Sequence, residues 1–493
     1  MITAASNKKI PHSSLLLLIA LIAALTGLFL FVVGSSSGSA VSVNGAVMAS
    51  FILNGVLALI MLIAEALRRP YSLVLMHWLF YSCFFVITPV SQYLSAFWCW
   101  SYPLSDDSLL TANALLFVWG VLFAFFSSSR LSLSRTGNPK ENVETKLRMP
   151  ESSCPPSINT GALLALSSLS LFLLIRLAGF ESLFSRSDYS LGLDQTSSLI
   201  ADKVLRGIPL FAFVLILKAS QKKKCTFTVL ASFLVLVIAA FPTGLARYNT
   251  AAIYGGIMLL LFPAMSKKKG VFAVLFLFAF LIVFPAMNAF RYANFSIETL
   301  FQSLIDSFGN IGSGFLTGDY DSYPMFVRAI EYVEAFGSTT GWQLITAILF
   351  FIPRSIWPSK GLGSGWTIAA AQGQDFKNVS CPLPGEGMIN FGVIGVVAFA
   401  IVFGIICRKI DEAYWSKSSP WDWPAWRLFY PFMCFFFFFM LRGDLLSSFA
   451  YLIGYGVVYF VLVFVFLRRV KRSPDILASK KQFHKHFDIS NQR

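Results

Sequence analysis

The chain has 493 residues, of which 56% are hydrophobic and only 13% are charged, and its mean hydropathy is +0.69. A soluble domain cannot hide that much apolar surface, whereas a lipid bilayer solvates it. The apolar runs are long and continuous, while a membrane β-barrel would show short alternating segments. We therefore predict an all-α, polytopic integral membrane protein.

About twelve apolar segments are predicted to span the membrane, because most of them approach the roughly 20 residues that a bilayer requires. In chain order they lie near residues 14–34, 46–67, 71–91, 109–127, 160–178, 207–219, 226–243, 249–265, 271–289, 390–407, 425–441 and 448–467. The apolar run 342–352 is too short to span and is followed by a proline, so we expect a re-entrant or interfacial helix there. We interpret residues 1–473 as a single transmembrane domain and residues 474–493 as a basic cytoplasmic tail.

The distribution of Lys and Arg predicts the orientation, because these residues concentrate in cytoplasmic loops. With the N-terminus inside, the lysine triplets at 222–224 and 267–269 are both cytoplasmic. A full span at 342–352 would place Arg408 and Lys409 outside, which favours the re-entrant interpretation. Both termini are then cytoplasmic, and the substantial outer loops are residues 179–206 and 292–389. The net charge of +15 reflects this topology, and no solvated face of basic and aromatic residues indicates a nucleic-acid partner.

The basic residues of the outer side are mainly arginines, several of them at predicted helix ends. A guanidinium group binds phosphate oxygens in a bidentate fork, so these side chains suit a lipid-linked pyrophosphate at headgroup depth. The alternative is that they reach to the membrane interface or pair with the outer acids. The candidate pyrophosphate- and glycan-binding cations are Arg247, Arg291, Arg328, Arg354, Lys360 and Arg442.

Two outer carboxylates are candidate catalytic residues. A buried, hydrogen-bonded carboxylate can act as a general base toward a sugar hydroxyl, and Glu386 and Asp321 are the residues that we select for this role. Each has a structural alternative. Glu386 lies between glycines just before a predicted helix, so it can balance the helix dipole. Asp321, with Asp319, can anchor a helix start at Pro324.

Aromatic residues are frequent on the outer side, among them Tyr320 and Trp357. Flat rings stack on the apolar faces of sugars, although the same rings also form the interfacial belt of membrane proteins.

No outer histidine is present in this topology, and the cysteines lack metal-ligand spacing, so we expect neither a metal nor a cofactor. Cys99 and Cys381 are the external cysteines, and they either form a disulfide or remain two free thiols.

Four stretches carry a resemblance to a known family: FPTGLARYNTAAIYGG, LTGDYDSYPMF, FIPRSIWPSKGLGSG and PGEGMINFGVIG. In these stretches the chain resembles the oligosaccharide repeat-unit polymerases, the Wzy-type O-antigen polymerase family. The resemblance is most specific over residues 240–400. Arg247, Arg291 and Arg354 fall within or beside the resembling stretches, which makes them the leading pyrophosphate contacts.

The resemblance implies a metal-independent, inverting glycosyl transfer at the periplasmic face of the bacterial inner membrane. Its substrates would be undecaprenyl-pyrophosphate-linked oligosaccharides, and a chain-length regulator and a flippase would be the partner proteins. Two other functions stay open. An O-antigen ligase would share the fold, although such ligases commonly rely on an outer histidine. A transporter or flippase usually carries ionisable residues or broken helices near the bilayer midplane, whereas the charges here lie at helix ends.

Overall fold

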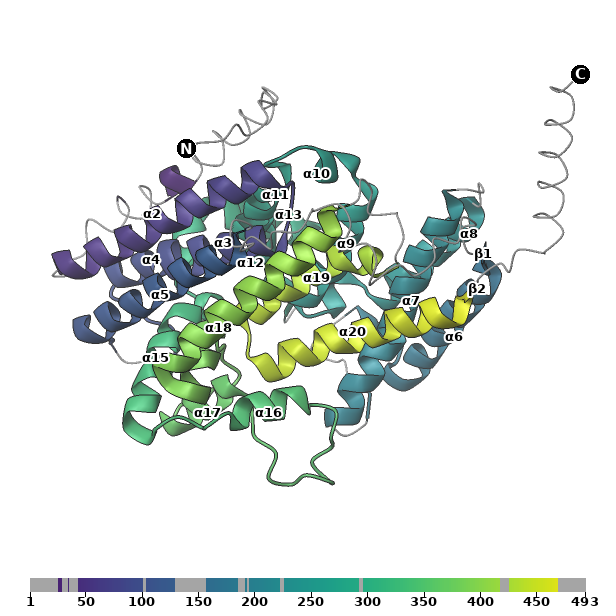
Figure 1. Cartoon of the computed structure of the whole chain (residues 1–493). Helices are drawn as coiled ribbons and strands as arrows, with labels where there is room; N and C mark the ends of the chain where they lie inside the picture. The colour runs from purple at the N-terminus through teal and green to yellow at the C-terminus, as the bar shows by residue number, and fades with distance from the viewer. Residues whose placement is uncertain are drawn as a thin grey trace, which may run out of the picture.

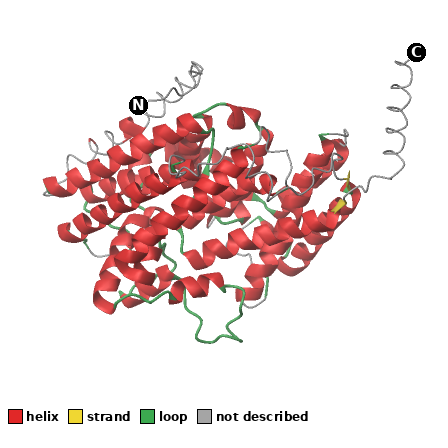
Figure 2. Cartoon of the chain, viewed as in Figure 1, coloured by secondary structure: helices red, strands yellow, loops and turns green. Residues whose placement is uncertain are grey.

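The computed structural model describes residues 25–28, 34, 43–100, 103–128, 157–184, 191–192, 195–221, 226–291, 296–416 and 425–468. These residues are mostly helical (Figures 1 and 2). The two strands in this part of the chain, β1 (Ser157–Ile158) and β2 (Leu467–Arg468), form a short antiparallel pair. The predicted all-α fold class is confirmed for the described residues.

Seven helical segments in the described ranges are long and apolar enough to cross a membrane. They are α2 (Gly45–Arg68), the run Leu73–Leu94, α5 (Asp106–Ser127), α6 (Thr160–Ala178), the run Thr226–Gly244, α18 (Leu383–Trp415) and α20 (Leu445–Phe466). They coincide with seven of the predicted spans, those near 46–67, 71–91, 109–127, 160–178, 226–243, 390–407 and 448–467.

Four other predicted spans fall on helices that lack this combination of length and hydropathy. These helices are α7 (Gln195–Ser220), α9 (Arg247–Leu261), the run Val271–Ala286 and α19 (Trp426–Arg442). The predicted span 14–34 lies largely outside the described residues, and the tail 474–493 lies wholly outside them. The total of about twelve spans therefore stays a prediction.

The remaining helices are short and connect or interrupt the longer ones. They are α3 (Leu73–Ser82), η1 (Cys83–Ile87), α4 (Thr88–Leu94), η3 (Glu181–Leu183), α8 (Thr226–Ala239), η4 (Pro242–Gly244), α10 (Pro263–Lys267), α11 (Val271–Phe278), η5 (Ala279–Val283), α12 (Phe284–Ala286), η6 (Ala289–Arg291), α13 (Ile297–Gly309), α14 (Ile311–Gly314), η7 (Gly318–Tyr320), α15 (Ser322–Phe336), α16 (Trp342–Ile348) and α17 (Ser364–Ala371). With seven residues, α16 is too short to span a bilayer, as expected for the run 342–352. Its predicted re-entrant placement stays a prediction.

Local sequence explains where several helices begin. The hydroxyl of Ser72 accepts the backbone N–H of Leu75 at the start of α3, and the side chain of Asn159 accepts that of Ala162 at the start of α6. Such caps satisfy backbone donors that have no partner inside the helix, and each contributes about 1 kcal/mol. The polar residues that flank the apolar runs thus fix the ends of these helices.

The core is built around α3, whose residues are all buried. α2, α18 and α19 pack against it, while α6, α7 and α8 pack on one another at the other side of the molecule (Figure 1). α20 contacts both α7 and α19, so it joins the two groups. The α19–α20 turn, residues 442–445, lies beside α16 and α18, because α16 contacts α20 and the Leu445 N–H donates to Glu386 of α18.

α18 is broken near its start. Phe391 and Gly392 have non-helical backbone angles, and the φ of Gly392 is +64°, a value that glycine adopts without steric cost. A Cβ placed on Gly395 would lie 1.9 Å from the carbonyl oxygen of Gly387. Residues eight apart in a continuous helix are about 12 Å apart, so the chain reverses at 391–392. The predicted span 390–407 therefore forms the second arm of a longer element, whose first arm, residues 383–390, is fully buried.

Candidate functional site

A first group of charged residues, which we call the arginine–aspartate cluster, consists of Arg247, Asp319, Asp321 and Arg442. The guanidinium of Arg247, at the start of α9, pairs with the carboxylate of Asp319 in η7. Arg442, at the end of α19, donates to the Asp319 carbonyl at 3.0 Å, and its Nη2 lies 3.2 Å from Asp321 Oδ1. Two arginines from different helices thereby hold one short helical turn, and two positive charges face two negative ones.

Asp321 is only 1% exposed and is held by three donors. The Trp100 indole N–H donates to its Oδ2 at 3.0 Å and the Ser380 backbone N–H at 3.1 Å, while Arg442 contacts the other oxygen. Its side chain makes no capping hydrogen bond to α15, although it directly precedes that helix. The helix-anchoring alternative is therefore not what this carboxylate does in the structure.

Tyr320 lies in the same segment and is 2% exposed. Its ring packs against Phe84, Phe280 and Phe315 at centroid distances of 5.6, 5.4 and 5.2 Å. The main-chain carbonyl of Tyr320 accepts the side-chain amide of Gln92 at 3.1 Å. The ring is thus part of the packed core and presents no open face for stacking on a sugar, contrary to the predicted role of Tyr320 as a glycan-binding residue.

A second group lies in the basic loop, which we define as residues 349–363 between α16 and α17. This loop projects from the end of the bundle where α15, α16 and α17 gather (Figures 1 and 2). Arg354 donates to the carbonyls of Lys360 at 2.5 Å and Gly361 at 2.8 Å. The Lys360 ammonium donates to the carbonyls of Phe350 at 2.6 Å and Ile352 at 3.0 Å.

The two cations of the basic loop have only backbone carbonyls as partners, and neither forms an ion pair with a carboxylate of the described residues. Burial and the neighbouring guanidinium of Arg354 lower the pKa of Lys360. Trp357, the aromatic candidate of this loop, is half-buried and packs edge-on against Trp342 at 5.3 Å. The loop therefore holds two positive charges that no described acid balances.

A third group, the carboxylate pair, consists of Glu386 and Asp444. Glu386 is 1% exposed, and its carboxylate accepts the Ser364 hydroxyl and the Leu445 backbone N–H, each at 2.7 Å. Asp444 caps α20 by accepting the Ser447 N–H at 2.9 Å, and burial raises its pKa. Both carboxylates thus lie at the N-terminus of α20, where the helix dipole favours negative charge. Glu386 caps this helix rather than its own.

The three groups meet at the α19–α20 turn. Arg442 belongs to the first group, and Asp444, two residues later, belongs to the third. The basic loop ends against the same turn, because a Cβ on Gly363 would lie 1.8 Å from the Asp444 carboxylate. The next residue, Ser364, donates to Glu386. Eight predicted site residues therefore lie in or beside one connected region: Arg247, Tyr320, Asp321, Arg354, Trp357, Lys360, Glu386 and Arg442.

Two predicted residues are not part of this connection. Arg328 lies on α15 and forms an ion pair with Glu331 at 2.6 Å, one turn further along the same helix. Arg291 ends η6, and its side chain lies outside the described part of the chain.

The sequence did not predict Ser364 as a contact of Glu386. The glycine-rich run Lys360–Ser364 was the signal available for it, because such residues permit close approach of the backbone.

Cys99 and Cys381, the two cysteines predicted to be external, are free thiols. Cys99 lies 2.9 Å from the carbonyl oxygen of Thr317, and burial raises the pKa of its thiol to about 12. Cys381 is fully buried, and burial likewise raises its pKa. Of the two alternatives that the sequence left open, two free thiols are the one that the structure has.

Comparison of the chain with known proteins finds no matching family model, no similar curated sequence and no similar solved structure.

Proposed function

We propose that this protein polymerises undecaprenyl-pyrophosphate-linked oligosaccharide repeat units into O-antigen or a related surface polysaccharide. The observation that carries the proposal is the pair of cations in the basic loop, Arg354 and Lys360, which contact carbonyl oxygens and no described carboxylate. A pyrophosphate group can replace these weak partners with charge-assisted hydrogen bonds, which are about twice as strong as neutral ones. The sequence resemblance supplies the substrate class.

The reaction is a displacement at the anomeric carbon of the growing chain. A hydroxyl oxygen of the lipid-linked acceptor unit attacks this carbon, and the bond between the carbon and the donor pyrophosphate oxygen breaks. The electron pair of that bond passes to the pyrophosphate. Arg354 and Lys360 stabilise the charge that develops on this leaving group, a role that positioned cations perform without a metal.

The proton of the attacking hydroxyl passes to a carboxylate, Glu386 by preference and Asp321 as the second choice. Ser364 already donates its hydroxyl to Glu386 at 2.7 Å. This is the geometry in which an acceptor hydroxyl would deliver its proton, so a substrate hydroxyl would take the place of Ser364. Asp321 has no oxygen available to a substrate hydroxyl in this way, because Trp100, Ser380 and Arg442 donate to both of its oxygens.

The proposal places the chain in the bacterial inner membrane, with both termini in the cytoplasm and the site at the periplasmic face. Seven apolar helices of membrane-spanning length support a membrane location. Lipid-linked units reach the periplasmic face through a flippase, and a chain-length regulator limits the number of transfers. Both are proposed partner proteins.

The test is a gel of surface polysaccharide from cells that lack this protein and then express the wild type, Arg354→Ala or Lys360→Ala. We expect a single repeat unit after deletion and a full ladder with the wild type. Either substitution should shorten or abolish the ladder while membrane levels of the protein stay normal. Arg176→Ala, at an exposed arginine near the end of α6, is the matched control and should restore the ladder.

Three results would contradict the proposal. If the Arg354→Ala variant and the Lys360→Ala variant each give a normal ladder, the loop cations take no part in the reaction. Loss of all surface glycan, with lipid-linked polymer accumulating at the periplasmic face, would indicate a ligase. Loss with single lipid-linked units retained at the cytoplasmic face would indicate a flippase.

A further inference from the structure

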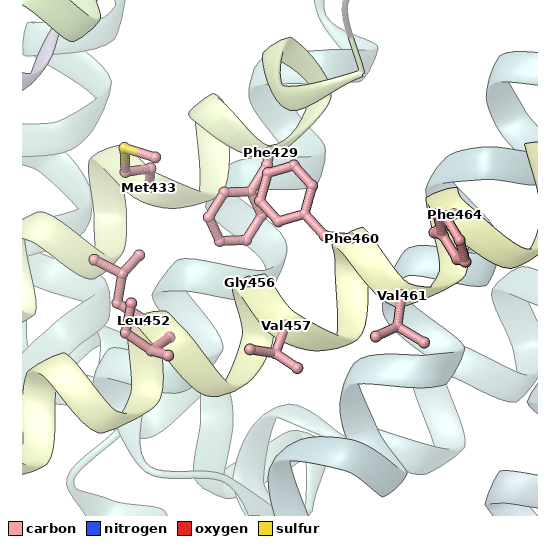
Figure 3. A pocket seen from close by; sticks show the side chains of 9 residues that line it. Phe429, Met433, Leu452, Gly456, Val457, Phe460, Val461 and Phe464 are labelled. Carbon is pink, nitrogen blue, oxygen red and sulfur yellow. The ribbon is translucent and has the colours of Figure 1, made fainter. Parts of the chain in front are cut away.

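An apolar groove runs between α19 and α20 (Figure 3). Its volume is about 640 Å³, within the range of about 300–1,000 Å³ that is typical of ligand sites. Every side chain that lines it is made of hydrocarbon or thioether groups. The lining residues are Phe429, Met433, Leu452, Ile453, Gly456, Val457, Phe460, Val461 and Phe464.

The groove leads away from the α19–α20 turn. Leu445, whose N–H binds Glu386, is the first residue of α20. At 1.5 Å per residue, Leu452 lies about 11 Å and Phe464 about 29 Å from it along the helix axis. A molecule with its polar end at the turn and its apolar part in the groove would therefore extend along most of α20.

The groove is open at the side of the helix pair. Val457, Val461 and Phe464 on its rim are 56%, 53% and 88% exposed. α20 is one of the helices apolar enough to cross a membrane, so this side would face lipid chains rather than water. A long hydrocarbon chain can enter such a groove sideways from the bilayer, whereas a soluble ligand cannot.

Gly456 keeps the floor of the groove open. A Cβ at this position would lie 3.5 Å from the ring of Phe429, which is an ordinary contact. A methyl group would therefore fit, but the larger side chain of leucine would press against the Phe429 ring and fill part of the groove that Gly456 lines (Figure 3). Gly456 is thus the position at which the groove can be closed with the smallest change to the helices.

We propose that the groove holds the polyprenyl chain of a lipid-linked substrate, with the pyrophosphate of that lipid at the α19–α20 turn and the basic loop. The identity of the lipid rests on the proposed function. The groove and the loop cations together fit a ligand with an anionic head and a long apolar tail. The groove alone would bind any hydrocarbon chain, so the head and the tail must be tested separately.

The experiment measures direct binding to the full chain in nanodiscs of phosphatidylethanolamine and phosphatidylglycerol. The probes are undecaprenyl pyrophosphate and farnesyl pyrophosphate, whose short tail cannot fill the groove. Gly456→Leu and Val457→Trp should weaken binding of undecaprenyl pyrophosphate by about tenfold, because several methylene groups lose their burial. Binding of farnesyl pyrophosphate should stay as in the wild type. Val402→Trp on α18 is the matched control, since Val402 is 50% exposed and does not line the groove.

Equal effects of Gly456→Leu and Val457→Trp on both probes, or no effect on either probe, would overturn the groove assignment. So would a wild type that binds the two probes with the same affinity. If the wild type binds undecaprenyl pyrophosphate more tightly through the groove but restores no polysaccharide ladder, only the proposed polymerase function is contradicted. If the wild type restores the ladder but binds the two probes equally well, only the groove assignment is contradicted.

Discussion

At the scale of single residues, Glu386 is the position where a structural and a catalytic role are hardest to separate. Its carboxylate accepts the Leu445 N–H at the N-terminus of α20 and the Ser364 hydroxyl. The first contact is that of a helix cap, and the second has the geometry required by the proposed role as a general base toward a hydroxyl. A substitution that keeps the first and removes the second can distinguish these roles.

We expect Glu386→Gln to fold and to fail in polymerisation. The amide oxygen can still accept the Leu445 N–H, so the free energy of unfolding should fall by only about 1 kcal/mol. An amide cannot take up a proton, so the amount of polymer should fall on the order of 100-fold or more. Melting of the purified protein and the polysaccharide ladder measure the two effects. A normal ladder from Glu386→Gln would leave Glu386 with the capping role alone.

At the scale of elements, the sequence of α13 indicates what surrounds this helix. Ile297, Phe301, Ile305 and Phe308 follow one another at helical spacing and are 63–66% exposed. α13 also contacts η5 and α12, which belong to the apolar run Val271–Ala286. An exposed apolar stripe beside an apolar helix is typical of a helix that lies in a membrane interface.

We therefore expect the α13 stripe to be covered by lipid. In intact membranes, a cysteine at Phe301→Cys should react with a membrane-impermeant maleimide at least about tenfold more slowly than one at Gln302→Cys, because lipid excludes the reagent. Both positions are exposed in the protein alone, so burial within the protein does not account for the difference. The two rates should become equal once the protein is unfolded in guanidinium chloride. Equal reactivity in membranes would mean that water reaches the stripe.

At the scale of the whole molecule, the sequence predicted the helices better than their contacts. The seven apolar helices follow from runs long enough to cross a bilayer, which is a local property. The break at Phe391–Gly392 was missed because the apolar pattern continues through it. The contact between Arg442 and Asp321 joins positions 121 residues apart, and that between Trp100 and Asp321 joins positions 221 residues apart. No local pattern encodes such pairs, so the sequence yielded the candidate residues but not their grouping.

The helices that carry the candidate site also meet in a second polar cluster at their other ends. Asp411, near the end of α18, is fully buried and accepts the backbone N–H groups of Leu73 and Val74 at 3.0 and 3.2 Å. It also pairs with Arg69 at 3.2 Å and accepts the Tyr430 hydroxyl at 2.5 Å. One carboxylate thereby joins the α2–α3 connection to α18 and α19. Its place in the fold predicts a role in stability rather than in the reaction.

We expect Asp411→Asn to lower the free energy of unfolding by about 1–3 kcal/mol. The substitution removes one of the two carboxylates that pair with the buried Arg69 and leaves Glu65, at 3.6 Å, as the other. Glu412→Gln is the matched control: Glu412 is exposed and lies 3.8 Å from Arg68, so its loss should cost less than about 1 kcal/mol. Melting of the purified proteins measures both. Asp411→Asn protein that remains folded at low temperature should still restore a full-length ladder, since the α19–α20 turn is unchanged. A ladder lost from fully folded Asp411→Asn protein would instead couple the two ends of α18 and α19 in the reaction.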